Sequence, residues 1–221
     1  MTDLLPLFPL GTVLFPGMAI PMHVFEERYR RLLADRHQTN PAFGIVLLRS
    51  GRDTDSTGKQ DVYSVGTAAR ILSRRRLGGG RYDLVVEGTS RFTIQSINWD
   101  LGYGLATVSW RDEPLGDPAR AHAALARTAA AFDRYLNAVT TVATRPIEGL
   151  RMSSDPLSAS YDLAARLTIP TWERQQLLEA EDAARRLALL GQLIAREHRL
   201  LVACGLIGIS LDHPGPRFTL N

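Results

Sequence analysis

The chain has 221 residues, of which 45% are hydrophobic and 22% are charged. This composition is typical of a globular protein with one large core or two small ones, and it excludes global disorder. The formal net charge of +3 is too small to indicate a nucleic-acid-binding protein, although basic residues can still cluster locally. The single cysteine, Cys204, excludes an internal disulfide and a cysteine-based metal cluster.

An uncharged run covers residues 4–25, about the length that crosses a bilayer as a helix. Prolines interrupt it, and each would cost a continuous helix roughly 3 kcal/mol. The start of the chain has no basic leader and no small-residue cleavage site follows the run, so we expect neither a membrane span nor an export signal, and a cytoplasmic location. The run instead predicts two strands, with Pro6 and Pro9 at edge or terminal positions, a turn at Pro16, and Pro21 opening the second strand.

The rest of the first half has the alternating pattern of strands. We expect a short helix over residues 26–36, a polar loop over 51–61, and strands over 43–49, 63–76, 81–97 and 102–110. The glycine-rich segment LGGG predicts a hairpin turn between the two long strands. Gly88 inside the second of them indicates a bulge or bend, which helps a sheet to curl. The half therefore predicts a small, partly closed barrel.

The second half has helical periodicity. Asp117 and Asp155 each precede a proline, which is typical of a helix N-cap followed by proline at the first helical position. In the last helix, Asp182 and Arg186 have the spacing of an i to i+4 ion pair. The sequence thus predicts an α+β protein with helices over residues 117–141, 155–167, 171–178 and 181–203. We expect a β-barrel subdomain over 1–113, a helical bundle over 117–203 and an irregular tail over 204–221.

Four segments carry a family resemblance: LPLFPLGTVLFPGMAIPMHVFEERY, YSVGTAARI, LVVEGTSRFTI and IPTWERQQLLEAEDAARRLALLGQLIARE. In this order, over roughly residues 4–201, they resemble the Lon substrate-binding domain, the amino-terminal domain of Lon proteases that also occurs as a stand-alone protein. VFEERY is closer to the stand-alone members. The resemblance implies a PUA-like β pseudo-barrel followed by a four-helix bundle. It also implies a module that binds unfolded or client polypeptides.

Catalytic and cofactor-binding alternatives fit the residues poorly. Full Lon enzymes continue into an AAA+ ATPase and a protease with a Ser-Lys dyad, whereas the only lysine here, Lys59, lies in a polar loop. The segment STGKQ lacks the first glycine and the Ser or Thr of a phosphate loop, and Asp53 and Asp55 begin no complete calcium loop. His23 has no second histidine at ligand spacing, so a hydrogen bond to a backbone or carboxylate partner is the better interpretation. We therefore expect no enzyme activity, no metal and no cofactor.

A polypeptide-binding surface requires exposed apolar side chains beside adaptable polar groups. The turn after the first strand offers Phe15 and Met18, and the early helix offers Glu27, Arg28 and Arg31 as a polar rim. Trp99 and Trp110, near strand ends, are weaker candidates because tryptophan often completes a core.

Two other partner classes stay open. A PUA-like fold and the segment SRRRLGGGR suggest nucleic acid, with Arg74 and Arg76 on one face of a strand, Arg75 on the other, and Arg81 across the hairpin. No aromatic residue is interleaved there for base stacking, which makes a solvated hairpin tip the simpler interpretation. Alternatively, the helical half docks a separate AAA+ protease. The sequence predicts no membrane partner.

Overall fold

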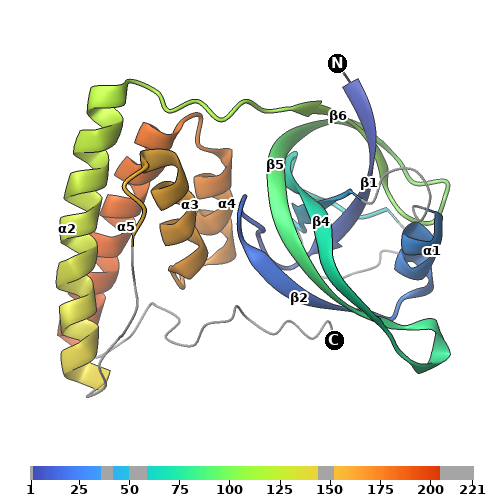
Figure 1. The fold of residues 1–221 in the computed structure, drawn as a ribbon, viewed down its shortest axis with the longest axis horizontal. Helices are drawn as coiled ribbons and strands as arrows, with labels where there is room; N and C mark the ends of the chain where they lie inside the picture. The colour runs from blue at the N-terminus through green and yellow to red at the C-terminus, as the bar shows by residue number, and fades with distance from the viewer. Residues whose placement is uncertain (1, 36–41, 50–58, 144–151, 205–221) are drawn as a thin grey trace. The chain divides into compact units, whose positions relative to one another are not determined.

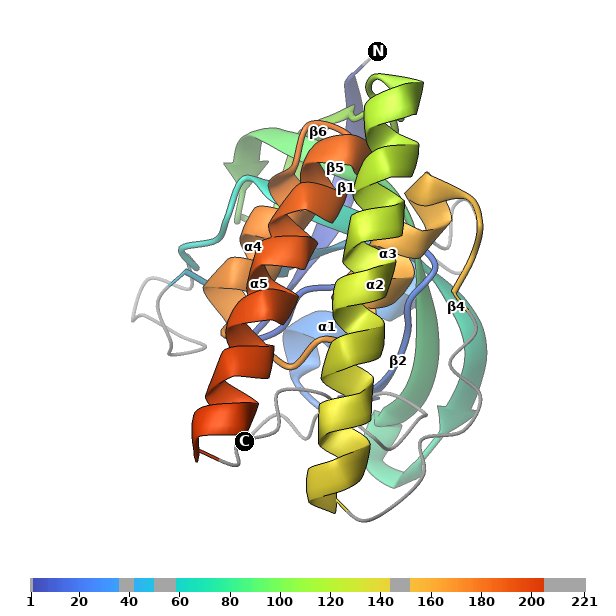
Figure 2. The same ribbon diagram turned by 90° about the vertical axis from the view of Figure 1, so that its left-hand side faces the viewer.

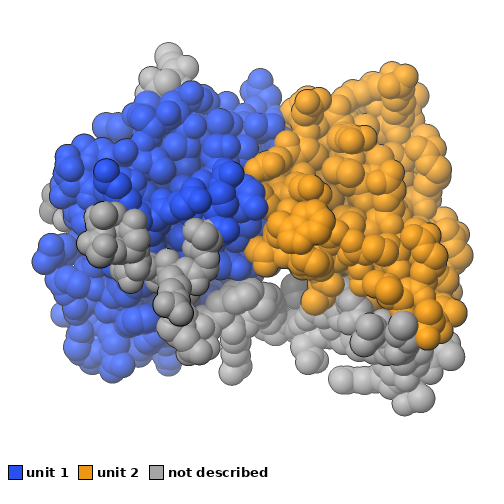
Figure 3. Space-filling view, turned by 180° about the vertical axis from the view of Figure 1, so that it is seen from behind, with its two compact units in different colours: residues 1–112, 214–221 blue, residues 113–213 orange. Residues whose placement is uncertain are grey.

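The computed structural model describes residues 2–35, 42–49, 59–143 and 152–204. The chain divides into two compact units, Met1–Asp112 and Glu113–His213 (Figure 3). Strands dominate the first unit and helices the second, so the predicted α+β class is confirmed. Cys204, predicted to begin the irregular tail, is instead the last residue of a helix, and the rest of that tail (205–221) and most of the predicted loop over 51–61 lie outside the described residues. No helix in the described ranges is long and apolar enough to span a membrane.

The first unit contains six strands and one α-helix among its described residues. In chain order they are β1 (Thr2–Leu10), β2 (Ala19–Val24), α1 (Glu27–Asp35), β3 (Phe43–Leu47), β4 (Val65–Arg76), β5 (Tyr82–Asn98) and β6 (Leu105–Trp110). The sheet order is β2-β5-β4-β3-β1-β6, and β5 also pairs with β6. The pairings of β1, β3, β4, β5 and β6 therefore close into a ring, here called the strand ring (Figure 1). β2 pairs with β5 outside that ring.

Glycines make room for a large side chain inside the strand ring. Phe92 is fully buried and belongs to a cluster with Leu5, Leu7, Val46, Ala68, Ala106 and Val108. A Cβ atom on Gly66 would lie 2.6 Å from the Ile45 carbonyl oxygen and 2.7 Å from the Phe92 ring. Because a real Cβ tolerates neither distance, the ring interior accepts Phe92 only beside glycine.

The uncharged run over residues 4–25 forms two strands joined by a turn, as predicted, and most of its residues are buried. β1 pairs with β6 through residues 2–6 and with β3 through residues 7–10. Pro6 thus ends one ladder, and Pro9 lies where β3 is the paired neighbour, so both prolines avoid a strand that is paired on both sides. Pro21 is the third residue of β2, so the prediction that it opens this strand is wrong. It nevertheless lies on an edge strand, where proline is tolerated.

The turn predicted at Pro16 is hydrogen-bonded to the bend predicted at Gly88. Gly17 has a φ of 76°, and the Met18 N–H donates to the Phe15 carbonyl, which closes the turn after Pro16. The Gly88 N–H in turn donates to the Met18 carbonyl. A side chain on Gly88 would collide with the Phe15 carbonyl oxygen, so only glycine permits this approach.

The second unit contains α2 (Pro118–Ala143), α3 (Pro156–Arg166), α4 (Thr171–Glu179) and α5 (Ala183–Cys204). Both predicted caps are confirmed. The Asp117 carboxylate accepts the Arg120 N–H at 2.7 Å, and the Asp155 carboxylate accepts the Ser158 N–H at 2.9 Å. The Ser158 hydroxyl also donates to the Asp155 carboxylate at 2.7 Å. This bond first, and then the bond from the Ser158 N–H, hold the pKa of Asp155 below its usual value.

α2 and α5 form the long axis of the helical unit and run side by side in the same direction (Figure 2). The Thr128 hydroxyl of α2 donates to the Leu187 carbonyl of α5 at 2.9 Å. A Cβ on Gly191 would lie 3.2 Å from that hydroxyl oxygen, closer than most real Cβ contacts, so the two helices approach closely there.

Candidate functional site

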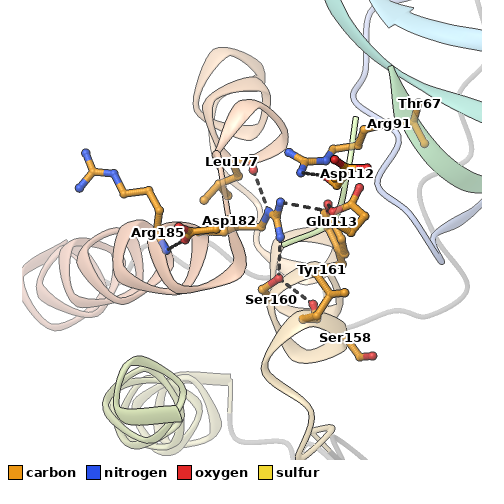
Figure 4. A network of polar contacts seen from close by, with 12 residues as sticks. Thr67, Arg91, Asp112, Glu113, Ser158, Ser160, Tyr161, Leu177, Asp182 and Arg185 are labelled. Atoms are coloured by element: carbon orange, nitrogen blue, oxygen red, sulfur yellow. Dashed lines mark hydrogen bonds and ion pairs between the residues drawn. The ribbon is translucent and has the colours of Figure 1, made fainter. Parts of the chain in front are cut away.

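The motifs that carry the resemblance build the fold. Thr67 is fully buried, and its hydroxyl donates to the Leu14 carbonyl at 2.7 Å. Arg91 is also fully buried, and its guanidinium donates to the Asp112 carbonyl at 3.3 Å (Figure 4). Thr67 and Arg91 thus connect β4 and β5 to the segments that follow β1 and β6, and Gly66 and Gly88 permit close packing of the backbone. The functional surface must therefore be sought elsewhere.

The predicted apolar contact pair is not exposed. Phe15 is fully buried and Met18 is only 9% exposed, because the turn folds back onto β5 through Gly88. The expectation of an exposed apolar surface at these two residues is therefore wrong. Their carbonyl groups, tied up by the Met18 and Gly88 N–H groups, close the turn against the sheet.

The predicted polar rim on α1 is accessible but internally paired. Glu27 is paired with Arg30 and Arg31 along the helix, and Arg28 is paired with Glu26 at 3.2 Å. The Arg28–Glu26 pair is partly buried, whereas the Glu27–Arg31 pair is exposed; an exposed pair contributes little to stability and can exchange partners at small cost.

An outward-facing surface lies on the other side of β2 and β5 from the core. In both strands burial alternates: Ile20, Met22, Leu84 and Val86 point inward and are buried. Their neighbours, which point outward, align in three rows across the sheet. We call this surface the outer sheet face; its rows are Ala19–Glu87–Arg70, Pro21–Val85–Ser73 and His23–Asp83–Arg75.

Ion pairs form the two outer rows. The Asp83 carboxylate is 2.8 Å from His23 Nδ1 and accepts from Arg75 at 2.5 Å, and these two partners, His23 first, lower the pKa of Asp83. The favoured interpretation of His23, a carboxylate partner, is therefore confirmed. In the opposite row, Arg70 donates to Glu87 at 2.5 Å.

The middle row is uncharged. Pro21 and Val85 are partly exposed there, and Leu72 lies beside them in the register shift between Ile71 and Ser73 with half of its surface exposed. The outer sheet face thus combines a small apolar strip with charged borders, the combination that polypeptide recognition requires. Its rows could not be read from the sequence, because the pairing of His23 with Asp83 spans 60 residues.

The arginines predicted to form a nucleic-acid patch lie in the β4–β5 hairpin, and they do not all lie on one face. The hairpin extends beyond the strand ring and turns through Gly78–Gly80 (Figure 1). Arg74 stacks on the Tyr82 ring at 4.0 Å, whereas Arg75 reaches Asp83 in the outer sheet face. The predicted alternation of the two faces is therefore present.

A buried polar network organises the second unit. The Arg186 guanidinium is fully buried, lies 3.9 Å over the Tyr161 ring, and donates to the Leu177 carbonyl and the Ser160 hydroxyl. The Tyr161 hydroxyl donates to Glu113 at 2.5 Å (Figure 4). The ion pair of Arg186 with Asp182 that the i to i+4 spacing suggested is thus not what holds Arg186; its guanidinium donates to Leu177 and Ser160 instead. Asp182 instead caps α5 by accepting the Arg185 N–H.

Two more arginines connect the short helices. Arg174 donates to the carbonyls of Ala164 and Leu167 at the end of α3, and its burial lowers its pKa to about 10. Arg196 of α5 forms a forked ion pair with the buried Glu173 of α4, which raises the pKa of Arg196. These contacts have the character of packing, and we assign no chemistry to them.

The described residues bring no group of three or more His, Cys, Asp or Glu side chains together in an arrangement that holds a metal ion. Lys59 is exposed. Cys204 ends α5, and its side chain is outside what the structure describes.

Comparisons with known proteins point to one family. The model of the ATP-dependent protease La (LON) substrate-binding domain matches residues 4–196. The Lon protease of Anaeromyxobacter dehalogenans is 28% identical over 202 residues, which cover 89% of this chain and 24% of that protein. The Lon protease of Escherichia coli K12 is 28% identical over 199 residues, 89% of this chain and 25% of that protein. The chain thus spans about a quarter of the length of these relatives.

Solved structures agree. The Lon N-terminal domain protein from Xanthomonas campestris is 28% identical with a TM-score of 0.57, covering 87% of this chain and 98% of that one. The N-terminal domain of Mycobacterium avium complex Lon protease has a TM-score of 0.62 at 21% identity, with the same coverage, and shows likeness of fold alone.

Proposed function

Because the chain belongs to the LON substrate-binding domain family, we propose that it is a polypeptide-binding module that recognises unfolded or client proteins. The family match over residues 4–196 is the observation that carries this proposal. We further propose that the module only binds, and that ATP hydrolysis and peptide cleavage are supplied elsewhere if they occur. The only lysine in the sequence, Lys59, is exposed, which supports this, since a Ser-Lys dyad needs a lysine in a protected site.

The form of the two units follows from the same relationship. We propose that the strand ring is a PUA-like pseudo-barrel and that α2 to α5 form a four-helix bundle. Support comes from the closed order of strand pairing and from the packing of α2 and α3 on α5. A reducing cytoplasm is proposed from the use of a single cysteine.

The outer sheet face is the proposed contact surface. Leu72 and Val85 supply exposed apolar area, while Arg75 and Glu87 lie in its charged borders. An extended chain laid across the sheet presents side chains alternately, so one set can meet the apolar middle row while backbone and polar groups meet the borders. The pairs on α1 that include Glu27, Arg28 and Arg31 remain candidates for a second polar border.

Binding of a permanently unfolded, reduced and alkylated protein tests the proposal. In fluorescence anisotropy we expect the full chain to bind this unfolded protein and not to bind the same protein in its folded state. Leu72→Ser should weaken binding by about threefold to tenfold, because an exposed apolar contact is worth roughly 1 kcal/mol. Leu101→Ser is the matched control, since Leu101 is 52% exposed and Leu72 is 50% exposed.

Equal loss of affinity in both variants would place the contact surface elsewhere. Absence of binding to the unfolded protein at any accessible concentration would refute the polypeptide-binding function itself.

A further inference from the structure

The β4–β5 hairpin carries a local excess of positive charge. The hairpin tip from Arg74 to Asp83 holds four arginines and one aspartate, a net charge of +3. The whole chain carries a formal net charge of +3, so all remaining residues sum to zero. The hairpin that carries this charge extends beyond the strand ring (Figure 1).

Three hydrogen bonds hold the backbone of the hairpin tip in place. The Leu77 N–H donates to the Arg81 carbonyl at 2.8 Å, and the Arg81 side chain donates to the Gly78 carbonyl at 3.0 Å. From α1, the Arg30 guanidinium donates to the Gly79 carbonyl at 2.8 Å. Because these bonds already order the backbone of the tip, binding a partner there costs little further conformational entropy.

Its arginines differ in availability. Arg76 and Arg81 are exposed, and the Arg75 side chain is 76% exposed although it is paired with Asp83. Arginine forks match carboxylates in a bidentate manner, so these side chains suit an acidic partner. Asp83 already occupies Arg75 and acts as an internal competitor for such a partner.

Two classes of polyanion can be compared. Single-stranded nucleic acid is bound by cationic grooves that also stack bases on aromatic rings. Tyr82 is the only aromatic residue between positions 74 and 83, and Arg74 covers its ring at 4.0 Å. An acidic polypeptide needs no stacking and gains from the apolar strip around Leu72 and Val85.

We propose that the hairpin tip, together with the adjoining outer sheet face, selects polypeptide segments that combine carboxylate side chains with apolar ones. This inference rests on the proposed polypeptide-binding function and narrows its substrate class. The tip supplies charge attraction, and the uncharged row of the sheet supplies apolar contact.

The test compares three labelled probes on the full chain by fluorescence anisotropy at low and high salt. They are a peptide of glutamate, leucine and serine, the same peptide with glutamine for glutamate, and an oligouridylate of equal length. We expect the acidic peptide to bind tightest, with an advantage that shrinks in high salt.

Two sets of variants locate the effect. Arg76→Gln with Arg81→Gln should weaken acidic-peptide binding by about threefold to tenfold and leave the glutamine peptide unchanged. Arg120→Gln with Arg127→Gln is the charge-matched control, because both side chains are exposed on α2. Asp83→Asn should strengthen acidic-peptide binding, since it frees Arg75 and removes a like charge.

The outcomes distinguish failure of the acidic selectivity from failure of the proposed polypeptide-binding function. Equal binding of both peptides, insensitive to the tip arginines, overturns the acidic selectivity and leaves polypeptide binding intact. If neither peptide nor an unfolded protein binds, both proposals fail. Tight, steeply salt-dependent binding of the oligouridylate alone assigns the tip to nucleic acid instead.

Discussion

The buried Arg186 network allows a quantitative prediction about the helical unit. Glu113→Gln keeps an oxygen that can accept the Tyr161 hydroxyl but removes the negative charge 4.0 Å from the Arg186 guanidinium. Two unit charges at this distance attract by about 4 kcal/mol at an effective dielectric constant of about 20. That figure is an upper limit, because the Glu113 side chain is 26% exposed and water screens it. We expect Glu113→Gln to lower the free energy of unfolding by about 1–3 kcal/mol.

A second substitution isolates the charge contribution. Arg186→Met keeps an apolar side chain of similar length over Tyr161 and removes the buried cation. In that background Glu113→Gln should cost less than about 0.5 kcal/mol, because no buried charge is left uncompensated. The difference between the two backgrounds is the coupling energy.

Urea unfolding monitored by helical circular dichroism measures the effect, since α2 to α5 contribute most of the helix. Fluorescence of Trp99 and Trp110 in a Trp172→Phe background reports the strand unit separately and should not shift. If Glu113→Gln costs the same with and without Arg186, the charge argument is refuted and only the hydrogen bond matters.

Three further predictions concern single contacts. Gly66→Ala should destabilise the strand unit by about 1–3 kcal/mol in urea unfolding, because the new Cβ overlaps the Phe92 ring; an unchanged midpoint would show that the ring interior is not tightly packed. Asp155→Ala should cost about 1 kcal/mol near neutral pH, while Asp155→Asn retains most of the cap. Because the folded-state pKa of Asp155 is lowered, this contribution is complete above its ordinary pKa of 3.8 and is lost as the pH falls through the folded value; a cost that persists in strong acid would contradict the cap. Arg174→Met should cost about 1–3 kcal/mol by leaving the Ala164 carbonyl without its donor, and loss of thermal stability equal to that of Arg127→Gln would argue otherwise.

Local patterns predicted the elements well. The strands, the hairpin turn and the capped helices depend on neighbouring residues, as at Asp155, and the structure has them within a few positions. The uncharged run was predicted to form strands because prolines exclude a helix, and it contains β1, where Leu7 and Phe8 are fully buried.

Side-chain environments set by distant pairing could not be predicted in the same way. Whether Phe15 is exposed depends on Gly88, more than 70 residues later, and the local sequence around the turn contains no sign of that approach. Arg186 likewise has the spacing of a surface ion pair, and only the tertiary packing of α3 and α4 against α5 buries it. The outer sheet face was missed for the same reason, since its rows join three strands.

The position of β1 has a consequence for how the chain folds during synthesis. β1 pairs Asp3 with Val108 of β6, so this ladder cannot form until more than 100 residues have been made. At about 5–20 residues per second the first half of β1 waits several seconds for β6, although residues 7–10 can pair earlier with β3. Prolines cannot donate to a cross-β ladder, and they interrupt aggregation-prone strands. Pro6, Pro9 and Pro21 therefore protect a nascent chain at the stage when its apolar first segment is only partly paired.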